Sequence, residues 1–274
     1  MVVTKTLEDV SIETLLATFN EAFSVYEIPV LMTKEQLLAH TRSIGYKKED
    51  SIGLFDQHHL VGFLQVARRG DFAYDGATGI IPSYQGKGLA HLLIDRTITH
   101  LKENKVKTFI LEVIDTNTRA KNLYLKHGFH ATRTLLCYQI ETKELSCRDS
   151  SSIKLVARDE LPLVEAECKP SWQNSNESVK DGDYSVMDII AEGKKRGYIC
   201  FNLSKGSIAQ IFIYKHERRN GYASKAIIAC SKLAITPTIG MLNVDGDYEP
   251  IHRVLAQMGF TLKLTQTEME RSLL

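Results

Sequence analysis

The chain has 274 residues, more than the roughly 100–200 residues of a typical domain, so two domains are expected. Hydrophobic residues make up 43% of it and charged residues 24%, as in soluble globular proteins. Its formal net charge of only +1 argues against a nucleic-acid-binding or membrane-surface protein, because such proteins usually carry a basic excess. We therefore expect no nucleic acid and no membrane among its partners.

The cysteines and the N-terminal residues favour a cytoplasmic protein. The 5 cysteines are odd in number and form no C-x-x-C pair, so neither a disulfide framework nor a zinc ribbon is expected. Free thiols suit a reducing compartment. No apolar run approaches the roughly 18 residues of a membrane span, and the first residues lack a signal-peptide pattern. No set of His, Cys and carboxylate residues has metal-ligand spacing, so no metal is expected either.

The predicted elements of the first half mix helices and strands. Helices are expected over residues 4–20 and 33–43, the second opening with Thr33 and Gln36 in capping-box spacing. The elements that follow are strands at 51–56, 60–67 and 72–81, a helix to about 102, a strand at 108–114, a helix that ends at Gly128, and a strand at 134–141. This order predicts a mixed α/β domain over residues 1–145.

The second half repeats this order after a polar segment at 142–152, which lacks periodicity and suits a linker. The expected elements are strands near 153–157, 185–192, 196–203, 208–214, 238–244 and 260–265, helices around 158–168, 174–180 and 248–259, and the loop and helix stretch "KHERRNGYASKAIIACSKLA" at 215–234. Two stretches of the first half, "IIPSYQGKGLAHLLIDR" and "NLYLKHGF", align with "FIYKHERRNGYASKAIIAC" and "RVLAQMGF" at nearly the same offset. Two anchors at one offset indicate a duplication, with a second domain over residues 152–274.

The stretch "SYQGKGLAHLL" at 83–93 has the pattern of an anion site. A strand ends, a glycine-bearing turn follows, and a helix begins, so unpaired amides and the positive end of the helix dipole lie together. Gly86 and Gly88 allow close approach of the backbone to a ligand, and Lys87 adds a charge. The P-loop and the dinucleotide fingerprint do not match, because no Ser or Thr follows a Gly-Lys pair and His91 occupies the third glycine position. Taken alone, the stretch suits a plain turn as well as an anion site.

A second pattern later in the chain decides between the two interpretations. The loop reads Gln85-x-x-Gly88-x-Ala90, and "NTRAKNLYLKHGF" carries Asn, Ala, Leu-Tyr and Gly-Phe in spaced positions from Asn117 to Phe129. Together they resemble the GNAT superfamily of acetyl-CoA-dependent N-acyltransferases. The resemblance covers most of residues 50–141. It implies an α/β (α+β) fold of two GNAT-like domains, each with a mixed, mostly antiparallel sheet flanked by helices, and acetyl-CoA as co-substrate.

The resemblance also implies roles for individual residues of the first half. The amides of Ile80 and Ile81 would bind the pantetheine arm and the acetyl carbonyl, and Asn117 would hydrogen-bond the same arm. The pyrophosphate would bind the loop amides, those of Gln85, Gly86, Lys87, Gly88, Leu89 and Ala90.

Tyr124 would protonate the departing thiolate, since a phenol with a pKa near 10 can protonate a thiolate whose acid has a pKa of about 8.5. The alternative is that Tyr124 is a core aromatic on an amphipathic helix. Glu112 and Asp75 are candidate general bases; the alternative is that each is solvated or structural and that ordered water takes this role. His58 and His59 lie in a predicted turn, where exposure to solvent is expected.

The second half keeps the loop but not the acid. Its loop residues are Arg218, Arg219, Asn220, Gly221, Tyr222 and Ala223, which satisfy Arg-x-x-Gly-x-Ala. Leu255 stands at the position that matches Tyr124, and Tyr248 at the position that matches Asn117. A leucine cannot donate a proton. Two interpretations stay open: a degenerate structural copy, or a domain that binds CoA without using a tyrosine acid.

These observations predict an N-acetyltransferase that transfers an acetyl group directly from acetyl-CoA to a primary amine of a small molecule or peptide. The acceptor would be bound by the first helices of each half, which nominates Phe23 and Tyr26 in the first half and Trp172 in the second. Burial in the core is the default for such aromatics. The alternative function is a non-catalytic regulatory module that binds CoA or acyl-CoA.

Overall fold

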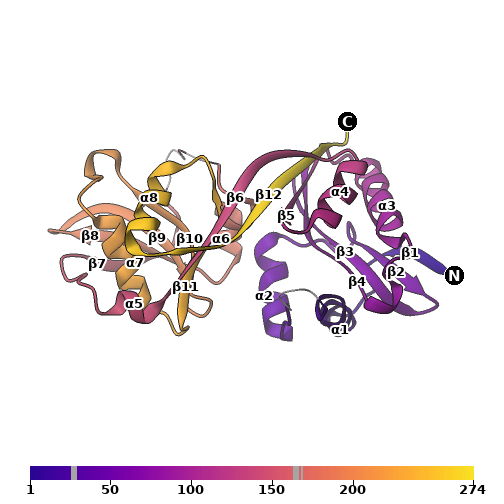
Figure 1. Ribbon diagram of the computed structural model, residues 1–274, viewed down its shortest axis with the longest axis horizontal. Helices are drawn as coiled ribbons and strands as arrows, with labels where there is room; N and C mark the ends of the chain where they lie inside the picture. Colours follow the sequence, from indigo (N-terminus) through magenta and orange to yellow (C-terminus); the bar gives the residue numbers. More distant parts are fainter. Residues whose placement is uncertain (26–29, 163–166, 168) are drawn as a thin grey trace. The chain divides into compact units, whose positions relative to one another are not determined.

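The computed structural model describes residues 1–25, 30–162, 167 and 169–274 (Figure 1). The chain divides into two compact units: unit 1 is residues 1–132 together with 268–274, and unit 2 is residues 133–267. These units differ from the predicted ranges 1–145 and 152–274. The difference arises at two long strands, β6 (His130–Glu141) and β12 (Thr261–Ser272), because each contributes residues to both units.

Unit 1 has a sheet in the order β1-β2-β3-β4-β5-β12-β6. Its other elements are β1 (Val2–Thr6), α1 (Ile12–Phe23), α2 (Lys34–Ile44), β2 (Ile52–Asp56), β3 (His59–Arg69), β4 (Phe72–Ile80), α3 (Leu89–Glu103), β5 (Thr108–Ile114) and α4 (Thr118–Lys126). The pairs β1–β2, β2–β3 and β3–β4 are antiparallel and β4–β5 is parallel. The predicted mixed, mostly antiparallel sheet is therefore confirmed.

The start of the chain differs from the helix predicted at 4–20. Val2–Thr6 forms a strand that pairs with β2, and its side chains alternate between half-buried and exposed. Such β-branched residues with period-two alternation favour a strand. The helix begins only after Ser11, whose side chain accepts a hydrogen bond from the Thr14 amide. The second helix starts as predicted, with the Thr33 and Gln36 capping box present in full.

Helices cover both faces of the sheet of unit 1: α1 and α2 lie on one side, and α3 and α4 on the other (Figure 1). Phe19 of α1, Phe63 of β3 and Leu93 of α3 are among the fully or almost fully buried side chains of this core. The helices also fix the positions of the loops at the ends of β4 and β5, where the candidate site lies.

The parallel strands β4 and β5 pair only at their beginnings. Phe72, Ala73 and Tyr74 pair with Thr108, Phe109 and Ile110, and no pairing follows beyond them in the described chain. The register between β3 and β4 shifts directly after Asp75. Such a bulge bends a strand and increases its local twist. The rest of β4 thus leaves β5, and its outward backbone groups pair with no strand among the described residues.

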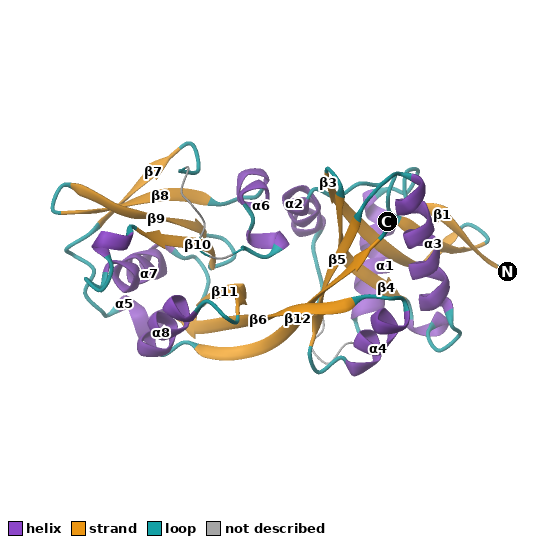
Figure 2. Cartoon of the chain, turned by 90° about the horizontal axis from the view of Figure 1, so that it is seen from above, coloured by secondary structure: helices purple, strands orange, loops and turns teal. Residues whose placement is uncertain are grey.

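The end of the chain completes the sheet of unit 1. Residues 268–274 belong to this unit, and β12 neighbours β5 (Figure 2). The Leu273 amide donates to the Lys107 carbonyl at 2.8 Å, and the side chains of Met269 and Leu273 are buried in the same core as α3. The last strand of the first domain is therefore supplied by residues that follow the whole of unit 2 in sequence.

Unit 2 repeats the arrangement in the order β7-β8-β9-β10-β11-β6-β12. Its elements are α5 (Thr142–Ser146), β7 (Lys154–Arg158), α6 (Asn176–Asp181), β8 (Ser185–Ala191), β9 (Lys194–Asn202), β10 (Ser207–Ile213), α7 (Tyr222–Leu233), β11 (Thr238–Asp245) and α8 (Glu249–Met258). The segment 142–152 is not simply a linker, because α5 buries Leu145 in the core of this unit. The helix predicted at 158–168 is wrong over its described first part, because Arg158 ends β7 and residues 159–162 form no helix; residues 163–166 and 168 lie outside the described residues.

Candidate functional site

The glycine loop of unit 1 lies between β4 and α3. Gly86 and Gly88 both have φ of 74°, and a Cβ built on either would meet no atom within 4 Å. Gly88 caps α3 without a side-chain hydrogen bond, so the first amides of the helix, from Leu89 and Ala90 onward, point out of the loop. The Lys87 ammonium lies over the Tyr84 ring, 4.6 Å from its centroid. The loop backbone thus has open space beside both glycines.

A side chain ties this loop to the end of β4. Gln85 Nε2 donates to the Ile80 carbonyl at 2.9 Å. The Ile81 amide donates to the Val61 carbonyl of β3 at 3.0 Å, so it is not available to a cofactor, contrary to our expectation. Because hydrogen bonding alternates along an antiparallel strand, the backbone of Ile80 faces the other way, toward the gap between β4 and β5.

Replacing Gly88 with Ala is expected to weaken acetyl-CoA binding about tenfold. The added methyl group would enter the open loop and displace about one hydrogen bond to a charged phosphate oxygen, worth about 1.5 kcal/mol. Gly70 provides a matched control, because its φ is 56° and its Cβ position is equally open. Both substitutions should reduce the free energy of unfolding by about 1–2 kcal/mol through left-handed strain. Calorimetric titration should show weaker binding only for Gly88→Ala, and equal affinities for both variants would contradict the assignment.

The predicted acid lies beside one of the two predicted bases. Tyr124 on α4 is 8% exposed, and its hydroxyl donates to Asp75 Oδ2 at 3.1 Å. Thr78 Oγ1 donates to the same oxygen at 2.7 Å. The other oxygen, Asp75 Oδ1, is buried and has no hydrogen-bond partner among the described residues. Burial raises the pKa of Asp75 to about 6.

The two interpretations of Tyr124 turn out to be compatible. Its ring packs edge-on against Phe129, with centroids 5.6 Å apart, inside the core. Its hydroxyl nevertheless reaches the polar cluster of Asp75 and Thr78 at the point where β4 leaves β5. The contact of Thr78 with Asp75 was not predicted, because residues three apart on a regular strand point to opposite faces and only the bulge brings these two together.

The remaining predicted residues of unit 1 lie as follows. Asn117 caps α4, its Oδ1 accepting from the Ala120 amide at 3.0 Å, which leaves its amide hydrogens directed elsewhere. Glu112 accepts from the Tyr74 hydroxyl at 2.9 Å, and His58 is exposed in the β2–β3 turn. Phe23 packs against Phe19, with centroids 4.6 Å apart. Tyr26 lies outside the described residues.

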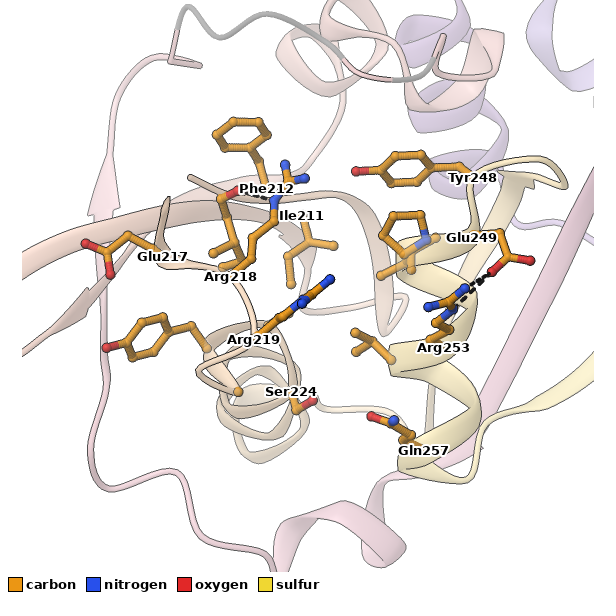
Figure 3. A pocket seen from close by; sticks show the side chains of 17 residues that line it. Ile211, Phe212, Glu217, Arg218, Arg219, Ser224, Tyr248, Glu249, Arg253 and Gln257 are labelled. Carbon is orange, nitrogen blue, oxygen red and sulfur yellow. Dashed lines mark hydrogen bonds and ion pairs between the residues drawn. The ribbon is translucent and has the colours of Figure 1, made fainter. Parts of the chain in front are cut away.

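The second loop, in unit 2, lines a cavity of about 590 Å³ (Figure 3). One wall is the end of β10 with the loop, including Arg218, Arg219, Gly221, Tyr222 and Ala223, and the opposite wall is α8 with Tyr248 and Arg253. Gly221 caps α7 with φ of 75°, like Gly88 in unit 1. Arg218 Nε donates to the Ile213 carbonyl at 3.0 Å, as Gln85 does to Ile80. The loop design of unit 1 is thus repeated.

One carboxylate and one backbone carbonyl accept hydrogen bonds from three side chains near this loop. Arg218 pairs with Glu167 at 2.8 Å, and the Tyr248 hydroxyl donates to the same oxygen at 3.1 Å. The Asn220 amide group donates to the Glu217 carbonyl at 3.1 Å. Arg218, chiefly through its hydrogen bond, lowers the pKa of Glu167, which keeps this carboxylate ionised.

In unit 2, the residues that correspond to Asp75 and Tyr124 are apolar. Ile208 precedes a register shift in β10 as Asp75 does in β4, and it stands as far before Arg218 as Asp75 stands before Gln85. Leu255, the counterpart of Tyr124, and Ile208 are both fully buried in the core of unit 2. Neither side chain can transfer a proton. The polar pair of unit 1 is therefore replaced by a hydrocarbon pair.

Comparison with known proteins identifies the family of the first half. Residues 13–129 match the family model described as the acetyltransferase (GNAT) family. This segment belongs to the GNAT family. The match includes the glycine loop and Tyr124 and ends at Phe129, which agrees with the resemblance drawn from the motifs.

Curated relatives of this GNAT segment are acetyltransferases. The chain is 36% identical over 80 residues to the [ribosomal protein bS18]-alanine N-acetyltransferase of Haemophilus influenzae, covering 29% of the chain and 54% of that protein. It is 27% identical over 125 residues to the mycothiol acetyltransferase of Corynebacterium glutamicum strain R, covering 45% of the chain and 43% of that protein. The chain thus spans about half the length of the curated relatives that it matches.

Solved structures extend the likeness to both halves. A tandem GNAT protein from the clavulanic acid biosynthesis pathway aligns over 100% of this chain and 98% of its own, with a TM-score of 0.70 at 11% identity. At this low sequence identity, the similarity shows a shared fold only. It bears out the prediction of two GNAT-like domains.

The described residues were also compared with two features that the sequence does not predict, a metal site and a membrane-spanning helix. Among these residues, no group of three or more His, Cys, Asp or Glu side chains is placed to hold a metal ion. In the same part of the chain, no helix has the length and apolar character needed to cross a membrane.

Proposed function

We propose that the chain is an N-acetyltransferase that moves the acetyl group of acetyl-CoA to a primary amine, with the reaction in unit 1. The observation that carries this proposal is the contact between Tyr124 and Asp75 at the point where β4 leaves β5. Family membership of residues 13–129 and the acetyltransferase names of the relatives support it. Those names concern a protein amine in one case and mycothiol in the other, so the acceptor class proposed here includes small molecules and peptides.

Acetyl-CoA would bind along the gap left by the two strands. The amides of the loop from Gln85 to Ala90 would bind the pyrophosphate, and the outward backbone of Ile80 and the amide of Asn117 would bind the pantetheine arm. This arrangement directs the thioester toward the Tyr124 hydroxyl. Cofactor binding of this kind requires no metal ion, because backbone amides and a helix dipole neutralise the phosphates.

The chemistry then needs two proton transfers. The neutral amine attacks the thioester carbonyl, and the nitrogen loses a proton as the tetrahedral intermediate collapses. Asp75 is the proton acceptor that the geometry favours over Glu112, because its carboxylate lies 3.1 Å from the Tyr124 hydroxyl, whereas Glu112 accepts from Tyr74 instead. Tyr124 gives its proton to the departing thiolate. A proton passing from Asp75 to the phenolate restores both groups.

Turnover with a panel of primary amines tests the proposal. Release of CoA thiol and formation of an N-acetyl product are expected for at least one small amine or peptide N-terminus. Binding of acetyl-CoA without product for any amine would instead support the regulatory alternative, a module that binds CoA or acyl-CoA without turnover.

Replacing Asp75 with Asn is expected to stabilise the protein while lowering its activity. The pKa of Asp75 is about 6 in the folded protein against an ordinary value of 3.8, so the folded state holds a proton that the unfolded chain releases between pH 4 and 6. The free energy of unfolding therefore falls as pH rises through this window. Above it, the buried charge costs up to about 3 kcal/mol. Asn keeps an acceptor oxygen without the charge.

Urea unfolding at pH 4 and pH 8 measures this effect. The gain in stability should be present at pH 8 and absent at pH 4, and acetyl transfer should fall by about 10²-fold at pH 8. Asp71→Asn is the control, because Asp71 is 54% exposed and pairs with Lys107 on the surface. A gain of equal size at both pH values would show that the charge of Asp75 is not its cause.

A second candidate function concerns unit 2 alone. We propose that its cavity binds CoA or acyl-CoA without transferring the acyl group. The cavity volume, the Gly221 helix cap and the arginines support binding, and the Ile208 and Leu255 pair supports the absence of chemistry. An acyl-CoA held there would keep its thioester.

A further inference from the structure

One arginine of the unit 2 cavity has a costly backbone conformation. Arg219 has φ of 65°, in the left-handed region, where its counterpart in unit 1 is Gly86 with φ of 74°. A residue with a Cβ costs about 1–2 kcal/mol there, whereas glycine costs little. Its side chain projects from the loop toward the cavity (Figure 3).

The charges that line this cavity are unequally paired. Arg218 is held by Glu167, and Glu217 pairs with Arg196 at 2.5 Å. Arg219 has no acidic partner among the described residues and is exposed. Within the described part of the chain, the cavity thus keeps a positive charge on Arg219 that no carboxylate neutralises.

A second cation stands on the opposite wall. Arg253 of α8 is 76% exposed, and its guanidinium forms an ion pair with Glu249, one turn earlier on the same helix (Figure 3). Such exposed pairs within a helix contribute only about 0.3–0.5 kcal/mol, so a phosphate can compete for this arginine. The aligned residue in unit 1 is Asn122, as Gly86 is for Arg219. Unit 1 therefore lacks both cations.

We infer that Arg219 and Arg253 make the unit 2 cavity selective for CoA that carries its 3′-phosphate. The inference rests on the proposed binding of CoA by unit 2. The loop amides and the start of α7 would bind the pyrophosphate, as proposed for the loop of unit 1, where neither arginine is present. Two further guanidinium groups provide charge-assisted hydrogen bonds for the remaining phosphate of the cofactor, which dephospho-CoA lacks.

The experiment compares CoA with dephospho-CoA in the full chain. Gly86→Asp blocks the loop of unit 1 with a negative charge, in a position where Asp tolerates the left-handed backbone. In this background, titration calorimetry should give a dissociation constant for dephospho-CoA about tenfold above that for CoA. Adding Arg219→Asn, which also tolerates positive φ, should reduce this ratio to about two. Arg253→Gln should reduce it in the same direction.

Further measurements distinguish this selectivity from a general effect of removing a positive charge and from the loss of CoA binding by unit 2. Arg148→Gln removes an exposed arginine of unit 2 that does not line the cavity, and it should leave the ratio unchanged. Equal weakening of both ligands by Arg219→Asn would overturn the selectivity and leave CoA binding by unit 2 standing. Absence of CoA binding in the Gly86→Asp background would overturn the proposed CoA site of unit 2 itself, and the selectivity with it.

Discussion

Replacing Tyr124 with Phe is expected to lower the kcat for acetyl transfer by about 10²-fold, while the KM for acetyl-CoA changes little. General acid catalysis contributes about 10²–10⁴-fold, and Phe keeps the ring that packs against Phe129 but cannot protonate the thiolate. Asp75 also loses one of its two side-chain donors, so its buried carboxylate becomes less well solvated. Steady-state kinetics with an amine whose chemical step limits the rate would measure the effect.

Tyr198→Phe is the matched control for this substitution. Tyr198 is a buried tyrosine of unit 2 whose hydroxyl donates to Gln210 Oε1 at 3.1 Å, so the same atom is removed from a comparable environment. It should leave kcat unchanged. If Tyr124→Phe also left both kcat and the pH profile unchanged, Tyr124 would not be the acid, and water would have to protonate the thiolate.

Removing residues 268–274 is expected to unfold unit 1, although these residues are distant from it in sequence. Met269 and Leu273 are 1% and 5% exposed in its core. Losing a buried Leu or Met side chain costs about 2–5 kcal/mol, and a whole domain is stable by only about 5–15 kcal/mol. The truncation also removes backbone hydrogen bonds beside β5, such as that from Leu273 to Lys107. Acetyl transfer should be lost together with the fold of unit 1.

Hydrogen exchange of peptides from β4 and β5, compared with peptides from β9 and β10, would measure this loss. Trp172 is the only tryptophan of the chain and lies in unit 2, so its fluorescence follows that unit separately. Removal of Leu274 alone, which is 91% exposed, is the control and should have no effect. Retained protection of β5 in the truncated chain would contradict the role of the C-terminal strand.

The sequence determined most of the local elements and the family of the first half, but not the first strand, Val2–Thr6. The loop from Gln85 to Ala90 and the segment from Asn117 to Phe129, which contains α4, carry local features set by neighbouring residues, namely glycines at positive φ and a helix cap. Such features are readable because they involve residues close in the chain. The duplication was visible for the same reason.

The tertiary structure alone decided which distant residues meet. Nothing in the spacing of Asp75 and Tyr124 indicates that their oxygens lie 3.1 Å apart, because the contact depends on where β4 leaves β5 and on how α4 packs. The same holds for the final strand of unit 1, which a linear reading assigned to the second domain. Strand pairing joins residues regardless of their separation in sequence, so the pattern of a single strand indicates its existence but not its partner.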